Sequence, residues 1–332
     1  MTKKKVLFIV GSLNTTTMAH QIHEHLPEYD RYFSPFYTGN LLDHIIPKFK
    51  YFTIMAQSHR ANSVNYLRRN RLPMDFMGRS QSYDFVVMCS DLIIPRNVRN
   101  KRIFLVQEGF ILPSNFWFFM VRNFGFHRVI CDTAATGLSD AYDLFFVASE
   151  GYRDLFIDRG IKEEKIRVTG IPNFDNAQSY VQNDFPHRHY VLAATSCLRE
   201  TGKYENRNQF IHKVKEVAAG RQIIFKLHPS EDIKRATQEI RKILPEALIF
   251  SSGDTNHMVA NCDVLLTRFS SVLLIGLALG KEVHADLPNE KMMPLLPIQN
   301  GGTSARRIAE TIKSYLEEQS SRYKDYHRAF GR

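Results

Sequence analysis

The chain has 332 residues, with 44 Lys and Arg against 34 Asp and Glu, so its formal net charge at pH 7 is +10. Hydrophobic residues make up 44% of it, which excludes intrinsic disorder as the main state, and the length predicts about two domains. The positive charge favours an anionic partner such as a nucleotide, an acidic polymer or a lipid headgroup. Nucleic acid is not an expected partner, because no helix-turn-helix, zinc-finger or ribonucleoprotein motif occurs.

The sequence predicts a cytoplasmic chain without a membrane span. The longest apolar run, residues 272–279, is interrupted by Gly276 and is far shorter than the roughly 20 residues that cross a bilayer. The start is basic and then apolar, as in a signal peptide, but its apolar part covers only residues 6–10, which we interpret as a first strand. The four cysteines are far apart and form no CxxC pair, which fits free thiols in a reducing compartment.

The first half alternates short apolar runs with segments of helical periodicity, a pattern typical of parallel α/β sheets. Strands are predicted at residues 6–10, 32–37, 85–89, 103–106, 144–148 and 166–169. A helix is predicted over residues 151–159, ended by Gly160. Residues 173–186 are polar, contain turn formers and show no apolar period, so we expect a linker there.

The second half repeats this alternation. Strands are predicted at residues 190–194, 222–227, 247–250, 263–267 and 282–285. Apolar stripes predict helices between them, and Ser304 is expected to cap a last helix. We therefore predict an α/β protein of two doubly wound, Rossmann-like domains that face each other across a cleft. The first covers residues 1–178 and the second residues 187–318, with a tail at residues 319–332.

Ligands of doubly wound sheets bind beyond the carboxyl ends of the strands, where the strand order reverses. In the second domain we expect this point between its first and fourth strands. Three polar clusters follow predicted strands of this domain, at residues 195–199, 226–230 and 267–271. They supply the candidate phosphate-binding residues Arg199, Lys226, His228, Arg268, Ser270 and Ser271.

Ser270 and Ser271 begin an apolar helix, whose free N–H groups and partial positive charge favour an anion. The alternative is that they serve only as a helix cap. His228 follows Lys226 at a strand end, where a histidine is either a phosphate contact or a hydrogen-bonded structural residue.

In the first domain, Glu108 and Gly109 follow a predicted strand and are expected to face the same cleft. A positioned glutamate can accept the proton of an attacking hydroxyl, although Glu108 could equally be an ordinary loop residue. Gly11, Ser12 and Asn14 form a tight loop that suits the close approach of a second substrate, or only a strand-to-helix turn. The absence of Asp-x-Asp, GxGxxG and GxxxxGK[ST] motifs argues against a metal-bridged diphosphate, dinucleotide oxidoreductases and P-loop kinases.

Residues 115–128 are rich in aromatic side chains and include Arg122 and Arg128. Packing into the core is the favoured interpretation, because aromatic residues are usually buried. The alternative is contact with the membrane interface or with a lipid-linked substrate.

Three of these motifs together resemble those of bacterial GT-B glycosyltransferases that build surface polysaccharide. The motifs are residues 107–110 (Gln-Glu-Gly-Phe), residues 226–229 (Lys-Leu-His-Pro) and the Ser270-Ser271 pair. The group includes sialyl- and Kdo-transferases and the CDP-glycerol glycerophosphotransferases of teichoic acid synthesis. Residues 168–172 and 278–281 also resemble segments of the UDP-N-acetylglucosamine 2-epimerase branch of that fold. The resemblance spans about residues 6–318, as short spaced motifs.

The resemblance implies a metal-independent GT-B transferase that needs no cofactor. It would move a sugar or polyol phosphate from a nucleotide-sugar or CDP-polyol donor to a glycan or lipid-linked acceptor of the cell envelope. It further implies that Glu108 is the catalytic base, that His228, Ser270 and Ser271 contact the donor phosphate, and that the first domain binds the acceptor. Peripheral contact with the inner face of the plasma membrane would follow from such an acceptor.

The sequence departs from several members of this group. Gln107 stands where sialyltransferases have a second acid, and Arg268-Phe269 stands where the glycerophosphotransferases often have Asp-Tyr. Only Arg199 with Glu205-Asn206 matches the His-Arg-x-Glu-Asn stretch of the epimerases. Two alternatives therefore stay open, a UDP-sugar 2-epimerase or hydrolase and a non-catalytic nucleotide- or glycan-binding protein.

Overall fold

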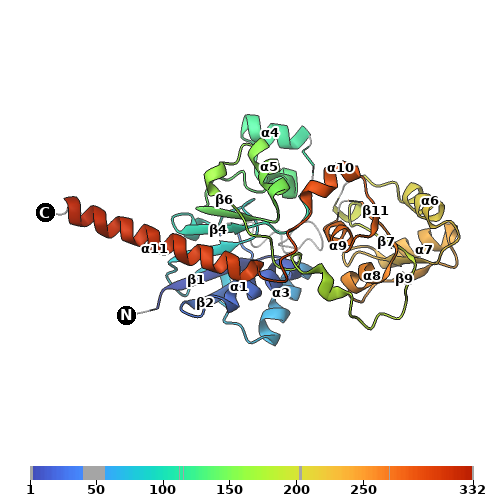
Figure 1. Cartoon of the computed structure of the whole chain (residues 1–332), viewed down its shortest axis with the longest axis horizontal. Coiled ribbons are helices and arrows are strands. Elements are labelled where there is room, and N and C mark those ends of the chain that lie inside the picture. The colour runs from blue at the N-terminus through green and yellow to red at the C-terminus, as the bar shows by residue number, and fades with distance from the viewer. Residues whose placement is uncertain are drawn as a thin grey trace.

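A computed structural model describes residues 3–39, 57–111, 113–114, 116–201, 204–268 and 270–330. Asn115 and Phe269, which belong to motifs considered above, lie outside the described residues. Two parallel sheets flanked by helices form two Rossmann-like domains, which lie side by side in Figure 1. The fold class predicted from the sequence is confirmed.

The first sheet has six parallel strands in the order β2-β1-β3-β4-β5-β6. Its strands are β1 (Lys5–Val10), β2 (Asp30–Pro35), β3 (Phe85–Met88), β4 (Arg102–Val106), β5 (Leu144–Val147) and β6 (Ile166–Val168). The helices of this half are α1 (Leu13–Glu24), α3 (Gln57–Arg69), α4 (Phe116–Phe124) and α5 (Glu150–Asp158). All four residues of β3 and of β5 are buried, because helices cover both faces, and this explains their uninterrupted apolar sequence.

The second sheet has five parallel strands in the order β11-β10-β7-β8-β9. Its strands are β7 (Val191–Ala194), β8 (Ile223–Lys226), β9 (Leu248–Phe250), β10 (Val264–Leu266) and β11 (Glu282–His284). The helices are α6 (Arg207–Ala218), α7 (Ile233–Ile243), α8 (Thr255–Asn261), α9 (Val272–Ala278) and α10 (Asn289–Met292). Because β7 lies between β10 and β8, the strand order reverses between the first and fourth strands of this domain, where the sequence placed it.

The last helix, α11 (Ser304–Phe330), lies against the first domain (Figure 1). Ile308 and Ile312 are fully buried in the core that contains β1, and Lys313 forms an ion pair with Glu28 at 2.8 Å. The expected second domain of residues 187–318 is therefore too long at its carboxyl end. The apolar stripe of α11 was recognised in the sequence, but periodicity does not say which domain a stripe packs against.

Ser304 is the first residue of α11, and its predicted role as the helix cap is wrong. Its hydroxyl donates a hydrogen bond to the Thr169 carbonyl at 3.1 Å, and its amide donates to the Asp175 carboxylate at 2.8 Å. Ser304 thus fastens the returning chain to the end of β6.

The expectation that the aromatic segment packs into the core is also wrong for most of it. Phe118 is buried, whereas Phe116, Trp117, Phe119, Phe124 and Phe126 are exposed. No helix in the described part of the chain is both long and apolar enough to cross a bilayer.

Candidate functional site

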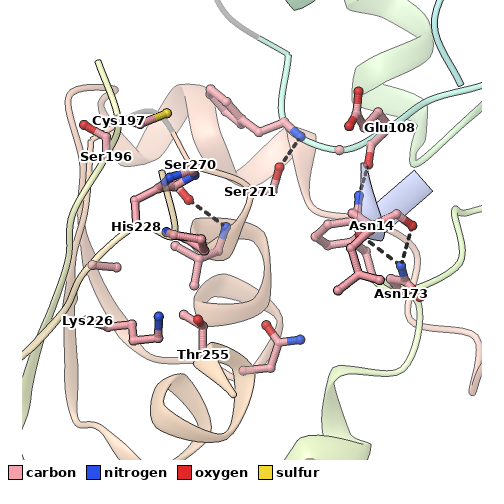
Figure 2. A pocket seen from close by; sticks show the side chains of 18 of the residues that line it. Asn14, Glu108, Asn173, Ser196, Cys197, Lys226, His228, Thr255, Ser270 and Ser271 are labelled. Atoms are coloured by element: carbon pink, nitrogen blue, oxygen red, sulfur yellow. Dashed lines mark hydrogen bonds between the residues drawn. The ribbon is translucent and has the colours of Figure 1, made fainter. Parts of the chain in front are cut away.

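A cavity of about 1010 Å³ is lined by loops of both domains. The first domain contributes the loop that follows β4, together with residues of α1 and α3. The second contributes the ends of β7 and β8 and the starts of α8 and α9. Seven of the residues predicted from the sequence line it: Asn14, Glu108, Gly109, Lys226, His228, Ser270 and Ser271. Figure 2 shows Lys226, His228 and Ser270 on one side and Glu108 and Asn14 on the other.

On the first-domain side, Glu108 is held by the loop that follows β1. Its Oε1 atom accepts a hydrogen bond from the Ser12 hydroxyl at 3.1 Å, and its backbone carbonyl accepts one from Asn14 Nδ2 at 2.8 Å. Asn173 Nδ2 donates in turn to Asn14 Oδ1 at 2.9 Å. Gly11 and Ser12 do not line the cavity. Ser12 caps α1, and its hydroxyl holds the Glu108 carboxylate through the hydrogen bond given above.

On the second-domain side, Lys226 places a buried ammonium group beside the cavity. Its Nζ donates to the Leu227 carbonyl at 2.9 Å, and burial lowers the pKa of this lysine. An ammonium has three donors, and a buried cation is stabilised by an anion nearby. The negative charges of Glu231 and Asp254 nearby oppose the fall in its pKa, and the remaining donors of Lys226 can bind an anionic ligand.

His228 is neutral at physiological pH. Burial, together with His59 and Lys226 nearby, lowers the pKa of His228 from 6.5 to about 4. Its Nδ1 accepts a hydrogen bond from the Ser230 amide at 3.1 Å, which places the proton of the neutral ring on Nε2. His228 can thus donate one hydrogen bond to a ligand without carrying a charge.

Ser270 and Ser271 have different roles at the start of α9. Ser270 Oγ accepts a hydrogen bond from the Val272 amide at 3.4 Å, a weak cap. Ser271 stands at the N-cap position of α9 but makes no side-chain cap hydrogen bond; its Oγ accepts from the Phe110 amide of the first domain at 3.0 Å. A Cβ atom on Gly109 would lie 2.5 Å from this oxygen, so the close approach of the two loops depends on Gly109.

Arg199 and Arg268 do not line the cavity. Arg199 forms a two-pronged ion pair with Glu239, both contacts at 2.8 Å, and Arg268 pairs with Asp286 at 2.6 Å. Both guanidinium groups are thus paired with carboxylates of their own domain. Because both arginines lie outside the cavity and are paired, they are not part of the candidate donor site. Their position at strand ends in the sequence does not reveal these ion-pair partners.

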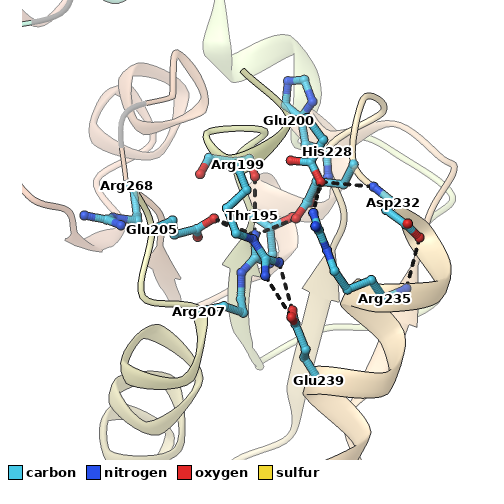
Figure 3. A network of polar contacts seen from close by, with 12 residues as sticks. Thr195, Arg199, Glu200, Glu205, Arg207, His228, Asp232, Arg235, Glu239 and Arg268 are labelled. Carbon is cyan, nitrogen blue, oxygen red and sulfur yellow. Dashed lines mark hydrogen bonds and ion pairs between the residues drawn. The ribbon is translucent and has the colours of Figure 1, made fainter. Parts of the chain in front are cut away.

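A buried polar network supports the loop that carries His228 (Figure 3). Glu231 accepts hydrogen bonds from the His228 amide at 2.8 Å, from Arg207 Nη2 at 2.5 Å and from the Thr195 hydroxyl. Arg207 also pairs with Glu205 at 3.0 Å. This network fixes the ends of β7 and β8 relative to each other, and with them the position of His228.

Several cavity residues were missed in the sequence. Asn173 lies in the stretch whose composition predicts a linker, and Tyr66, Asp254 and Thr255 belong to segments without a recognisable motif. Ser196 belongs to the polar cluster of residues 195–199; its buried hydroxyl lines the cavity and has no hydrogen-bond partner among the described residues. Its place directly after β7, at the reversal of strand order, is the signal that could have identified it.

The cavity combines the Glu108 carboxylate of the first domain with neutral and cationic donors of the second, whose wall also includes the Asp254 carboxylate that caps α8. Within the described ranges, no group of three or more His, Cys, Asp or Glu side chains is placed to hold a metal ion. The arrangement suits an anionic ligand on the second domain and a hydroxyl group near Glu108.

No family model matches the chain. The processive diacylglycerol β-glucosyltransferase of Staphylococcus epidermidis is 25% identical over 132 residues, which are 37% of this chain and 33% of that protein. The match thus spans about a third of the length of this curated relative.

Solved structures resemble almost the whole chain. A putative UDP-N-acetylglucosamine 2-epimerase from Listeria monocytogenes has a TM-score of 0.62 at 15% identity, covering 96% of this chain and 98% of its own. The S. aureus MnaA structure with UDP has a TM-score of 0.61 at 12% identity, covering 95% and 97%. The wall teichoic acid polymerase TagF has a TM-score of 0.54 at 13% identity, covering 96% and 90%. The chain therefore has the GT-B fold, as the motif resemblance implied.

Proposed function

We propose that the chain is a GT-B transferase that moves a sugar or polyol phosphate from a nucleotide-activated donor to a glycan or lipid-linked acceptor of the cell envelope. The nucleotide and its phosphates would bind the second domain, and the acceptor hydroxyl would approach from the first. The observation that carries this proposal is the shared cavity, in which Glu108 of one domain faces Lys226, His228 and Ser270 of the other.

The proposed reaction is a displacement at the transferred group. The acceptor oxygen bonds to the transferred sugar carbon, or to phosphorus for a polyol phosphate, while its proton passes to the Glu108 carboxylate. The bond to the leaving phosphate oxygen breaks, and that oxygen keeps the electron pair. Ser12 and Asn14 hold Glu108 in place through its carboxylate and its carbonyl.

Charge on the leaving nucleotide would be stabilised by this chain's own donors. Lys226 supplies a cation, and neutral His228 supplies an Nε2–H donor. Ser270 and Ser196 add hydroxyl groups at the same wall. With these groups we propose transfer that needs neither a metal ion nor an organic cofactor.

A second candidate is a UDP-sugar 2-epimerase or a related hydrolase. It is favoured by one observation, the match to the Listeria protein, which has a TM-score of 0.62 and covers 98% of that chain. Such an enzyme would convert the donor without an acceptor. A non-catalytic nucleotide- or glycan-binding protein would bind the donor and leave it intact.

We further propose that the protein works in the cytoplasm and contacts the inner face of the plasma membrane. No disulfide joins the four cysteines, all of which lie in the described part of the chain, and this suits a reducing compartment. An envelope acceptor carried by lipid would bring the protein to the membrane surface.

The proposal is tested first by a thermal-shift screen with CMP, CDP, UDP, GDP and their sugar or glycerol derivatives. A ligand that binds only the folded state raises the melting temperature. The donor found in this way is then incubated with the protein alone and with candidate acceptors, and the products are identified by NMR. Product only with acceptor supports transfer, a changed sugar without acceptor supports epimerisation, and an intact donor under all conditions supports a binding protein.

Glu108→Gln tests the assigned base. We expect turnover to fall by about 100-fold or more, the usual contribution of general base catalysis, with nucleotide affinity unchanged in calorimetry. Glu246→Gln is the matched control, because Glu246 is exposed on the second domain and does not line the cavity. Equal loss of binding and turnover in Glu108→Gln would remove Glu108 from the catalytic role.

A further inference from the structure

The segment from α4 to the following 3-10 helix exposes an aromatic surface that the proposed reaction does not use. Six large apolar side chains there are between 44% and 67% exposed: Phe116, Trp117, Phe119, Phe124, Phe126 and Ile130. We call these six residues the aromatic face. They lie within 15 consecutive residues, and their rings meet in pairs, Phe116 with Trp117 at 5.5 Å and Phe119 with Phe124 at 5.9 Å between centroids. Neighbouring exposed aromatic rings form a patch, which single scattered surface residues do not.

The helix α4 packs on the protein along a narrow stripe only. Phe118 and Val121 are buried in a small cluster with Cys131, Ala134 and Ala135, and the Arg159 guanidinium lies 5.3 Å from the centre of the Phe118 ring. Outside this stripe the helix is still apolar. A helix that is apolar on nearly all sides needs a second apolar environment, which the described part of the chain does not supply.

The charge around the aromatic face favours an anionic surface. No Asp or Glu occurs between Gly109 and Cys131. Arg122 donates to the Asp158 backbone carbonyl at 3.2 Å and Arg128 to the Asp91 backbone carbonyl at 3.3 Å. Neither arginine has an ion-pair partner among the described residues, so both keep their positive charge uncompensated by a carboxylate.

Both ends of this segment reach the cavity. Phe110, six residues before α4, lines it, and so does Thr133, which follows the aromatic face. The segment therefore leaves the cavity wall, presents its aromatic side chains at the edge of the first domain, and returns to the wall. In Figure 1, α4 lies at the outer edge of this domain.

We propose that the aromatic face docks on an anionic lipid bilayer and brings the first-domain side of the cavity to the membrane surface. Exposed Trp and Phe side chains next to Arg are the combination that binds the interface between headgroups and acyl chains. The inference deepens the proposed function and rests on its lipid-linked acceptor, because it identifies the residues through which the protein reaches such an acceptor.

The test uses intrinsic fluorescence, because Trp117 is the only tryptophan in the chain. The full-length protein is mixed with vesicles of phosphatidylcholine alone or of phosphatidylcholine with phosphatidylglycerol. We expect the Trp117 emission to shift to shorter wavelength and to be quenched by brominated acyl chains, more strongly with the anionic vesicles. Emission unchanged by both kinds of vesicle would overturn the proposal.

Co-sedimentation with the same vesicles tests the residues. The triple variant Phe116→Ser, Trp117→Ser, Phe119→Ser should lower partitioning by about tenfold or more. The control is Tyr204→Ser with Ile233→Ser, because these second-domain side chains are 85% and 50% exposed. Equal loss in both variants, or no loss in the triple variant, would contradict the docking surface. A dimer in light scattering that the triple variant dissociates, without vesicle binding, would assign the face to a second copy of the chain.

Nucleotide-induced thermal shift is measured on the same preparations. A triple variant that keeps its shift but loses vesicle binding supports the docking surface. A parent protein that binds vesicles but no nucleotide would overturn the proposed function and leave the membrane contact standing, so the two failures are distinguishable.

Discussion

The Ser271 hydroxyl of the second domain accepts a hydrogen bond from the Phe110 amide of the first domain at 3.0 Å. Phe110 lies two residues after Glu108, so the loop that carries the proposed base is tied to the start of α9. Because the hydroxyl accepts this bond, its own proton can still be donated to a ligand. Ser271 thus connects the proposed donor site with the proposed base.

Gly109→Ala tests the connection between Ser271 and Phe110. The new Cβ atom would lie 2.5 Å from Ser271 Oγ, so either this hydroxyl rotates away from the Phe110 amide or the two loops separate, and both break the hydrogen bond. We expect turnover with the identified donor to fall by about tenfold or more, because a displaced catalytic group loses its productive geometry. Nucleotide affinity, measured by calorimetry, should change less than turnover.

Ser271→Ala is the companion variant, since it removes the hydrogen bond without a steric clash. A smaller decrease in turnover is expected, of the size of one lost hydrogen bond, about 1 kcal/mol. Full turnover in both variants would show that the domains do not need this contact.

Glu231→Gln tests the network behind His228. Glu231 is buried and accepts from Arg207, from the His228 amide and from Thr195. Removing one member of a buried ion pair leaves the other charge uncompensated, so we expect a loss of about 3 kcal/mol in the free energy of unfolding, measured in urea. The exposed Glu246→Gln control should lie within about 0.5 kcal/mol of the parent.

Glu231→Gln should also weaken nucleotide binding, because the position of His228 depends on Glu231. Unchanged stability would mean that Glu205 alone compensates Arg207, and the network would then lose its assigned structural role.

The strands and the reversal of strand order could be predicted from the sequence, because buried parallel strands consist of short, uninterrupted runs of apolar residues. Cavity residues at strand ends, such as Glu108, Lys226 and His228, follow from that topology. The ion pair of Arg199 could not be predicted, since its partner Glu239 lies on α7, 40 residues away, and ion pairing depends on tertiary structure.

Other features depend on packing that local sequence does not encode. The apolar stripe of α11 is visible in the sequence, but its contact with α1 across the chain is not. The helix α4 has the composition of a core segment, yet only Phe118 and Val121 pack against the rest of the first domain. Asn173 lies in a stretch that has the composition of a linker, but the fold brings its side chain within hydrogen-bonding distance of Asn14.

His23 provides a test of pH-dependent stability that is independent of the cavity. Its ring packs 5.3 Å from the Phe33 ring, and its Nδ1 atom has no hydrogen-bond partner among the described residues. Burial, together with the charges of Arg31 and His20, lowers the pKa of His23 from 6.5 to about 4. The folded state therefore keeps this ring neutral over a range in which the unfolded chain binds a proton.

The sign follows from that difference in bound protons. Between pH 6.5 and about 4 the unfolded state binds more protons, so the free energy of unfolding falls as the pH falls, by up to about 1.4 kcal/mol per pH unit for each such histidine. Stability from His23 is fully present above pH 6.5 and is lost as the pH falls toward about 4. His228, whose pKa is also lowered to about 4, adds a slope of the same sign.

His23→Leu should therefore flatten the stability curve, measured by urea unfolding at a series of pH values, while nucleotide binding at neutral pH stays unchanged. The control is His212→Leu, because His212 is exposed on α6 and should leave the slope as it is. His228→Gln should flatten the curve as well, but it should also weaken nucleotide binding, because His228 lines the cavity and His23 does not. If His23→Leu leaves the slope at the parent value, the His23 ring is not held neutral by its burial, and the acid sensitivity has another origin.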